Sequence, residues 1–237
     1  MRKLGSMLFF LLSIVSSANA QSIVDLTNAA PWYFKEANKA ESQWFQAKVP
    51  GTIHQDLLVH QLIADPYLLN NEQQAQWPAQ KEWLYQTTIL LTPAMLNYSQ
   101  IDLVFDGLDT DAEIFINGKK IASVNNMFRV WKFNVRSLLK TGDNDLKIKF
   151  LASEQLAALA YEKLQPKIPL DERIMVRKAA YQFGWDWGPR FVTAGIWKKV
   201  QLKFWNSAKI ENIKYSQVEL NDLKAILEFP FSSQILK

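Results

Sequence analysis

Apolar and polar residues alternate along much of the chain from residue 83 onward. A two-residue period places successive side chains on opposite faces of a strand, and it is typical of sheets that bury one face. Short runs with this period, or with several strand-forming residues together, are separated by turn residues. The pattern predicts strands over residues 83–91, 101–105, 112–116, 119–124, 128–135, 146–150 and 200–204.

Turn residues indicate how these strands connect. Asn117-Gly118 separates two predicted strands, and it predicts a tight hairpin because both residues tolerate positive φ. Helical periodicity is visible over 52–62 and over 154–164, the second with Ser153 as its N-cap. Residues 166–197 are predicted to form a long loop rich in Trp and Pro. Loops of that length are usually functional or disordered, and the aromatic content argues against disorder.

Many short strands and few helices predict an all-β sandwich over residues 21–207. Beyond it, two further strands are predicted over 210–218 and 223–229. Two strands cannot close a sandwich of their own. We therefore expect residues 208–237 to begin a second domain that the chain does not complete, and we interpret the chain as a fragment of a longer protein.

Residues 1–20 have the layout of a secretory signal peptide. They combine a positive start (Arg2, Lys3), an apolar run over 7–15 and a small-x-small pattern ending at Ala20. The apolar run is too short to span a bilayer comfortably. We expect an exported protein, periplasmic or secreted, with no membrane association after the signal is cleaved.

Charge and composition indicate which classes of partner the chain suits. The net charge of +4 is spread along the chain, and no basic stripe argues for nucleic acid. There is no Cys, so no disulfide supports the fold. Nine Trp, fourteen Phe and seven Tyr suit a β-sheet protein, and they also suit sugar binding, because flat rings stack on the apolar faces of pyranoses.

The most conspicuous candidate site is the segment 181–190. It places Trp185 and Trp187 around Asp186, between two glycines, with Arg190 four residues on. A carboxylate beside aromatic rings can accept bidentate hydrogen bonds from sugar hydroxyls while a ring packs on C–H groups. The competing structural interpretation is a buried Trp cluster in which an Asp186–Arg190 pair staples the loop.

Other titratable residues give weaker signals. Asp106, Asp109 and Asp111 cluster near a strand end, but they lack the spacing of a calcium loop, so we expect turn capping and solvated surface there. His54 and His60 have neither a Cys nor a suitably spaced His nearby to suggest zinc. The sequence predicts no metal site and no cofactor.

Several separate motifs resemble the β-mannosidases of glycoside hydrolase family 2. The string Phe183-Gly184-Trp185-Asp186-Trp187-Gly188-Pro189-Arg190 is similar to a loop motif of these enzymes. Further similar segments occur in the same order along the chain and cover nearly all of it after the signal. They are residues 49–58, 65–67, 71–72, 77, 83–85, 105–110, 116–118 and 177–178.

The resemblance implies a galactose-binding-like jelly-roll domain, followed by an immunoglobulin-like domain and a TIM barrel. Family 2 enzymes are exo-acting, retaining glycosidases whose two catalytic Glu lie on the barrel. By this resemblance Trp185 and Asp186 contact the terminal mannose of an oligosaccharide, and Arg177, Trp187 and Arg190 support them. The barrel is missing from this sequence, so we expect no catalytic residue here and no activity from the chain alone.

Two alternatives stay open. The chain could be a non-catalytic carbohydrate-binding module with the same fold, although such modules usually present their site on their own sandwich. It could also be the front of another family 2 glycosidase, a β-galactosidase or a β-glucuronidase. The Trp-Asp-Trp loop favours the β-mannosidases among these.

Overall fold

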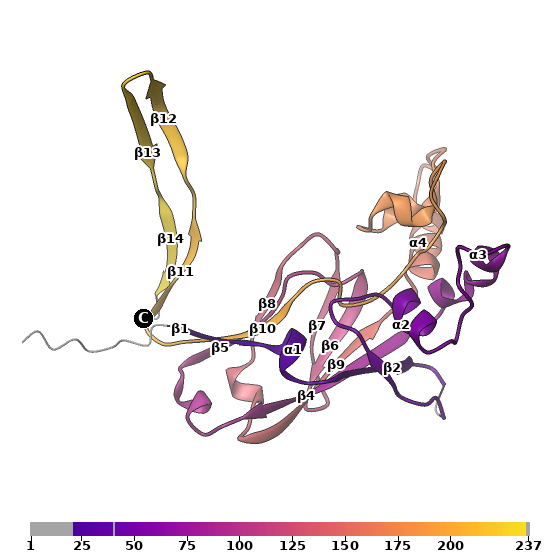
Figure 1. The fold of residues 1–237 in the computed structure, drawn as a ribbon, viewed down its shortest axis with the longest axis horizontal. Coiled ribbons are helices and arrows are strands. Elements are labelled where there is room, and N and C mark those ends of the chain that lie inside the picture. Colours follow the sequence, from indigo (N-terminus) through magenta and orange to yellow (C-terminus); the bar gives the residue numbers. More distant parts are fainter. Residues whose placement is uncertain (1–20, 40, 236–237) are drawn as a thin grey trace, which may run out of the picture.

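The computed structural model describes residues 21–39 and 41–235, and it folds as two packed antiparallel sheets (Figure 1). The larger sheet has the order β3-β2-β4-β9-β6-β7. Its strands are β2 (Trp32–Glu36), β3 (Phe45–Ala47), β4 (Trp83–Leu91), β6 (Asp111–Ile116), β7 (Lys119–Asn125) and β9 (Gly142–Phe150). The smaller sheet has the order β1-β10-β5-β8, formed by β1 (Gln21–Asp25), β5 (Gln100–Phe105), β8 (Trp131–Asn134) and β10 (Val200–Trp205).

The core lies between the two sheets, where the two-residue period predicts it. Along β4, every second residue is buried while the residues between them are more exposed; the buried ones are Trp83, Tyr85, Thr87, Ile89 and Leu91. Strand β9 alternates in the same way, with Leu146, Ile148 and Phe150 fully buried. The inner face of the smaller sheet contributes similar apolar side chains from β5 and β10. The prediction of an all-β sandwich is confirmed.

The predicted hairpin at Asn117-Gly118 is present, with positive φ at both residues, 50° and 80°. The two predicted helices are present but shorter: α2 (Ile53–Val59) and α4 (Ser153–Glu162). The prediction of Ser153 as N-cap is wrong by one residue. Its hydroxyl donates instead to the Asp111 carboxylate, at 2.9 Å, and Ala152 is the cap.

Short elements complete the described chain. They are α1 (Leu26–Ala29), α3 (Asn71–Gln74) and the 3₁₀ helices η1 (Trp77–Gln80), η2 (Met95–Asn97), η3 (Arg136–Leu138), η4 (Glu172–Met175) and η5 (Ala180–Phe183). The strand predicted over 128–135 is reduced to β8. Its expected first half is a turn in which the Phe128 amide donates to the Asn126 side chain at 2.9 Å.

The C-terminal residues form a two-stranded ribbon that projects away from the sandwich (Figure 1). The ribbon contains two successive antiparallel pairs. In the first, β11 (Ala208–Ile213) pairs with β14 (Phe231–Ile235); in the second, β12 (Ser216–Asn221) pairs with β13 (Lys224–Glu228). The prediction of one strand over 210–218 is wrong. The ladder is interrupted beside Pro230, whose carbonyl accepts from the Lys214 amide at 2.9 Å. That this ribbon begins an immunoglobulin-like domain stays a prediction.

The base of the ribbon is attached to the smaller sheet by charge. Lys209 is almost buried and pairs with the Asp102 carboxylate, which also accepts from the Trp205 indole at 2.9 Å. Within residues 21–39 and 41–235, no helix is long and apolar enough to cross a membrane. The predicted signal peptide, residues 1–20, lies outside the described residues.

Candidate functional site

The Trp-containing loop lies between α4 and β10, and it has local structure of its own (Figure 1). Helix η5 is followed by a miniature hairpin in which Trp185 and Gly188 exchange two backbone hydrogen bonds, of 3.3 and 3.2 Å. Gly184 precedes this hairpin with φ of 98°, a conformation that L side chains rarely adopt. The hairpin therefore presents Asp186 and Trp187 at its tip.

The tip of this hairpin is exposed to solvent. Trp185 is 54% exposed and Trp187 is 84% exposed, and their rings meet edge to face at 6.2 Å. Asp186 between them is exposed as well. A large indole usually lies inside a fold or at an interface, so two exposed ones at a loop tip indicate a contact surface. The interpretation as a buried Trp cluster is wrong.

Arg190 holds the C-terminal end of the loop, and its partners are not Asp186, with which the structural interpretation paired it. Its guanidinium donates to the Gln76 amide oxygen at 2.7 Å and forms an ion pair with Glu154 of α4. Its backbone amide donates to the Glu72 carboxylate of α3, at 2.7 Å. Arg190 thus links the loop to two helices, and Asp186 remains available to a ligand.

The N-terminal end of the loop is held by a buried charge. Lys178 and Asp109 form an ion pair at 2.5 Å, with side chains 0% and 1% exposed. Gln182 donates to the other oxygen of the Asp109 carboxylate at 3.0 Å. The expectation that the Asp cluster is solvated surface is wrong for Asp109, because the loop covers it. Burial lowers the pKa of Lys178, and the charge of Asp109 opposes that shift.

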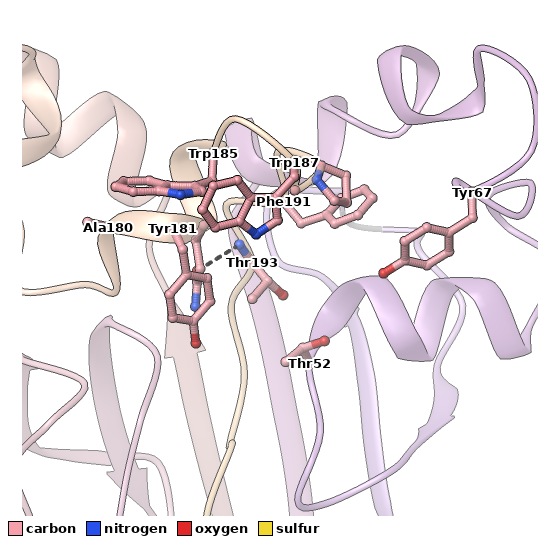
Figure 2. A pocket seen from close by; sticks show the side chains of 11 residues that line it. Thr52, Tyr67, Ala180, Tyr181, Trp185, Trp187, Phe191 and Thr193 are labelled. Carbon is pink, nitrogen blue, oxygen red and sulfur yellow. Dashed lines mark hydrogen bonds between the residues drawn. The ribbon is translucent and has the colours of Figure 1, made fainter.

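A cavity of about 770 Å³ opens beside the hairpin (Figure 2). Trp185, Trp187 and Tyr181 line it from the loop, and Tyr67 lies across from them, with Phe191 and Thr193 between. The described residues that line it carry aromatic, hydroxyl and amide groups and no charge. Such a surface suits a neutral ligand with apolar faces and hydroxyl edges. Asp186 lies outside this lining, on the tip.

His54 lies behind the aromatic wall. Its ring is 5.3 Å from that of Phe191, and its Nε2 is 3.3 Å from the Ala75 carbonyl oxygen. Burial lowers its pKa to about 4, so the ring is neutral at pH 7. Its Nδ1 is buried without a hydrogen-bond partner in the described chain. His54 is not among the residues that line the 770 Å³ cavity, but it lines a smaller adjoining cavity together with Tyr67, Phe191 and Thr193.

The residues that the sequence predicts for the site differ in how they lie relative to the cavity. Trp185 and Trp187 both line the cavity, although the resemblance gives Trp187 only a supporting role. Arg177 is exposed, and its carbonyl accepts from the Met127 amide at 3.1 Å. Its neighbour Lys178 makes the buried contact. Among the described residues, no group of three or more His, Cys, Asp or Glu could hold a metal ion.

Sequence reasoning did not identify Lys178, Gln182, Asp109 or Tyr67 as site residues. Lys178 and Tyr67 occur in segments that resemble the family, but nothing in their local sequence shows that a lysine 69 residues from Asp109 is buried against it. Asp109 stands close to two other Asp residues, 106 and 111, and nothing in the local sequence shows that only its carboxylate is buried.

The fold is a galactose-binding-like β-sandwich that carries an exposed aromatic hairpin. Residues 32–198 match the family model described as the glycosyl hydrolase 2 galactose-binding domain-like domain. The chain belongs to this family.

Named relatives agree with this assignment. β-Mannosidase B of Aspergillus terreus is 39% identical over 191 residues, covering 76% of this chain and 22% of that protein. β-Mannosidase B of Aspergillus niger is 36% identical over 193 residues, with the same coverage of both chains. The chain thus spans about a fifth of the length of these curated relatives.

Solved structures show the same fold. The β-D-mannosidase of Dictyoglomus thermophilum superposes with a TM-score of 0.85 at 36% identity, covering 90% of this chain and 26% of that chain. A β-glucuronidase from an uncultured Clostridium sp. superposes with a TM-score of 0.58 at 16% identity, covering 90% and 34%. The second likeness concerns the fold alone.

Proposed function

We propose that this chain is the amino-terminal part of an exported, exo-acting, retaining β-mannosidase. In this proposal the hairpin at 185–188 contacts the terminal, non-reducing β-D-mannose of an oligosaccharide. The observation that carries it is an exposed carboxylate, Asp186, between two exposed indoles on a loop that is fixed at both ends. The names of the relatives and of the first structural neighbour support β-mannoside as the substrate.

The chemistry of the tip fits this role. Asp186 can accept hydrogen bonds from two hydroxyl groups of one sugar, because an ionised carboxylate has two acceptor oxygens. The Trp185 ring, 54% exposed, offers a flat face to the C–H groups of the pyranose. A fixed loop also avoids the entropy cost of ordering these groups on binding.

The proposal assigns catalysis to another part of the protein. Retaining hydrolysis uses two carboxyl groups roughly 5–5.5 Å apart, one as acid/base and one as nucleophile. In the described residues the cavity beside the hairpin is lined without a carboxylate. We therefore expect immunoglobulin-like and barrel domains of the full-length protein to supply the catalytic pair, and the isolated chain to be inactive.

The test compares variants of the full-length enzyme that contains this chain. Asp186→Ala removes two charge-assisted hydrogen bonds of about 1.5–3 kcal/mol each, so kcat/KM for p-nitrophenyl β-D-mannoside should fall roughly 10²–10⁴-fold. The matched control is Asp143→Ala, which changes an exposed Asp in β9 and should leave activity unchanged. Wild-type kinetics for Asp186→Ala would assign the loop a structural role instead.

Substrate class is tested on the same enzyme with the β-D-galactoside and the β-D-glucuronide. Faster turnover of either would favour the alternative of another family 2 glycosidase. The module alternative is supported by one observation, the 770 Å³ cavity that this chain forms by itself. Titration of the isolated chain with mannobiose tests it: saturable binding that Trp187→Ala abolishes would favour a sugar-binding module.

A further inference from the structure

Two side chains of the Trp loop, Lys178 and Gln182, donate to one carboxylate, that of Asp109 in the connection between β5 and β6. Lys178 donates to one oxygen of Asp109 at 2.5 Å, and Gln182 donates to the other at 3.0 Å. The same two side chains also bond to the backbone of Thr193. Lys178 donates to its carbonyl at 2.5 Å, and the Gln182 amide oxygen accepts from its N–H at 3.3 Å.

This cluster joins the two strands of the loop at its base. Lys178 and Gln182 precede the hairpin and Thr193 follows it, so the cluster around Asp109 includes residues from both sides of the hairpin. The backbone of Asp109 is itself paired with Gly195 by two hydrogen bonds of 2.9 Å. Because Asp109 lies in the short connection between β5 and β6, its carboxylate ties the loop that carries Trp185 and Asp186 to these two strands.

We propose that Asp109 is a positioning residue, which sets the place of the Trp185–Asp186 hairpin relative to the sandwich through Lys178 and Gln182. The role in sugar recognition rests on the proposed function, whereas the positioning itself does not. The cluster explains why a lysine and a carboxylate, each costly to bury, lie together beneath a surface loop.

Stability alone is a poor explanation for this pair. Taking two charges out of water costs about as much as their attraction returns, and an apolar pair of similar volume often stabilises a fold as well or better. A buried ion pair does, however, impose one geometry, since each charge loses its compensation if the partner moves. Gln182 adds direction, because its two ends distinguish Asp109 from Thr193.

The first experiment uses the chain as it exists, without sugar, and measures amide hydrogen exchange by NMR. Gln182→Met removes the link that Gln182 makes between Asp109 and Thr193, and it leaves both contacts of Lys178 in place. The amides of Gly188 and Thr193 should exchange at least about tenfold faster, while amides of β5 and β10 change little. The control is Gln155→Met, the same substitution at an exposed helical amide that donates to the Gln80 carbonyl.

A double variant tests the ion pair itself, because a single change there would leave one buried charge without a partner and could prevent folding. Asp109→Asn combined with Lys178→Met removes both charges together, so neither is left buried without a partner. We expect a melting temperature near that of the wild type together with the same selective loss of protection in the loop. Equal acceleration in loop and sandwich, or none in either, would overturn the proposal.

Activity then separates this inference from the proposed function. In the full-length enzyme, Gln182→Met should lower kcat/KM for the β-mannoside about tenfold or more, because a misplaced contact of about 1.4 kcal/mol corresponds to that factor. Unchanged kcat/KM with faster loop exchange would refute substrate contact by the hairpin and leave positioning by Asp109 established.

Discussion

Helix α2 contains two buried titratable groups whose pKa values are shifted in opposite directions. Burial lowers the pKa of His54 from its ordinary value of 6.5 to about 4. Burial likewise raises the pKa of Asp56 from 3.8 to about 6, although the Lys48 amide and the Tyr85 hydroxyl, each 2.8 Å away, partly offset this effect. The two side chains are 8% and 2% exposed.

These shifts make opposite contributions to the free energy of unfolding. The contribution of His54 is fully present above pH 6.5 and is lost as pH falls toward 4, because the folded state resists protonation. The contribution of Asp56 is fully present below pH 3.8 and is lost as pH rises through 6, because the folded state favours the neutral acid. Each amounts to about 3 kcal/mol.

We therefore expect the two contributions to cancel in the wild-type chain between pH 4 and 6. His54→Gln should become more stable by about 3 kcal/mol as pH falls across this window, and Asp56→Asn should become less stable by about as much. The assay is urea unfolding of the isolated chain at half-unit pH steps. Asp143→Asn, at an exposed position of β9, is the control for general charge effects.

The test compares how steeply the free energy of unfolding changes with pH in the two variants, because its absolute value changes with any substitution. If both variants followed the wild-type dependence on pH, the opposing shifts would not exist, and the burial of the two groups would have to be relieved by water. If only one variant departed, the shift of its counterpart alone would be confirmed.

Further predictions concern activity, packing and surface. The isolated chain should not hydrolyse p-nitrophenyl β-D-mannoside, and turnover abolished by changing one of its own carboxylates would contradict the assignment of catalysis elsewhere. Gly195→Ala should lower the free energy of unfolding by about 1–3 kcal/mol in urea denaturation, because φ is 151° and a Cβ would lie 2.7 Å from the Gly51 carbonyl oxygen. Leu223→Lys, at a ribbon position 97% exposed, should reduce aggregation in light scattering without changing the melting temperature.

The hairpin residues of the candidate site could be identified from the sequence, but their exposure and their partners could not. The string from 183 to 190 stands out in the sequence because Trp, Asp and Gly are unusual together. Its exposure was not predictable, because a pair of indoles is as compatible with a core as with a surface. Arg190 shows the same limit, since the sequence suggested Asp186 as its partner and the structure supplies Glu154 and Gln76.

The sequence by itself determined the strands, the Asn117-Gly118 hairpin and the sandwich class, because alternation and turn residues act between neighbours in the chain. It also carried the family resemblance, in motifs that are read locally. Only the tertiary structure decided which charges are buried and what holds the Trp loop in place. The contact of Lys178 with Asp109 joins residues far apart in sequence. Folding removes both charged groups from water, and each then offsets the cost of burying the other.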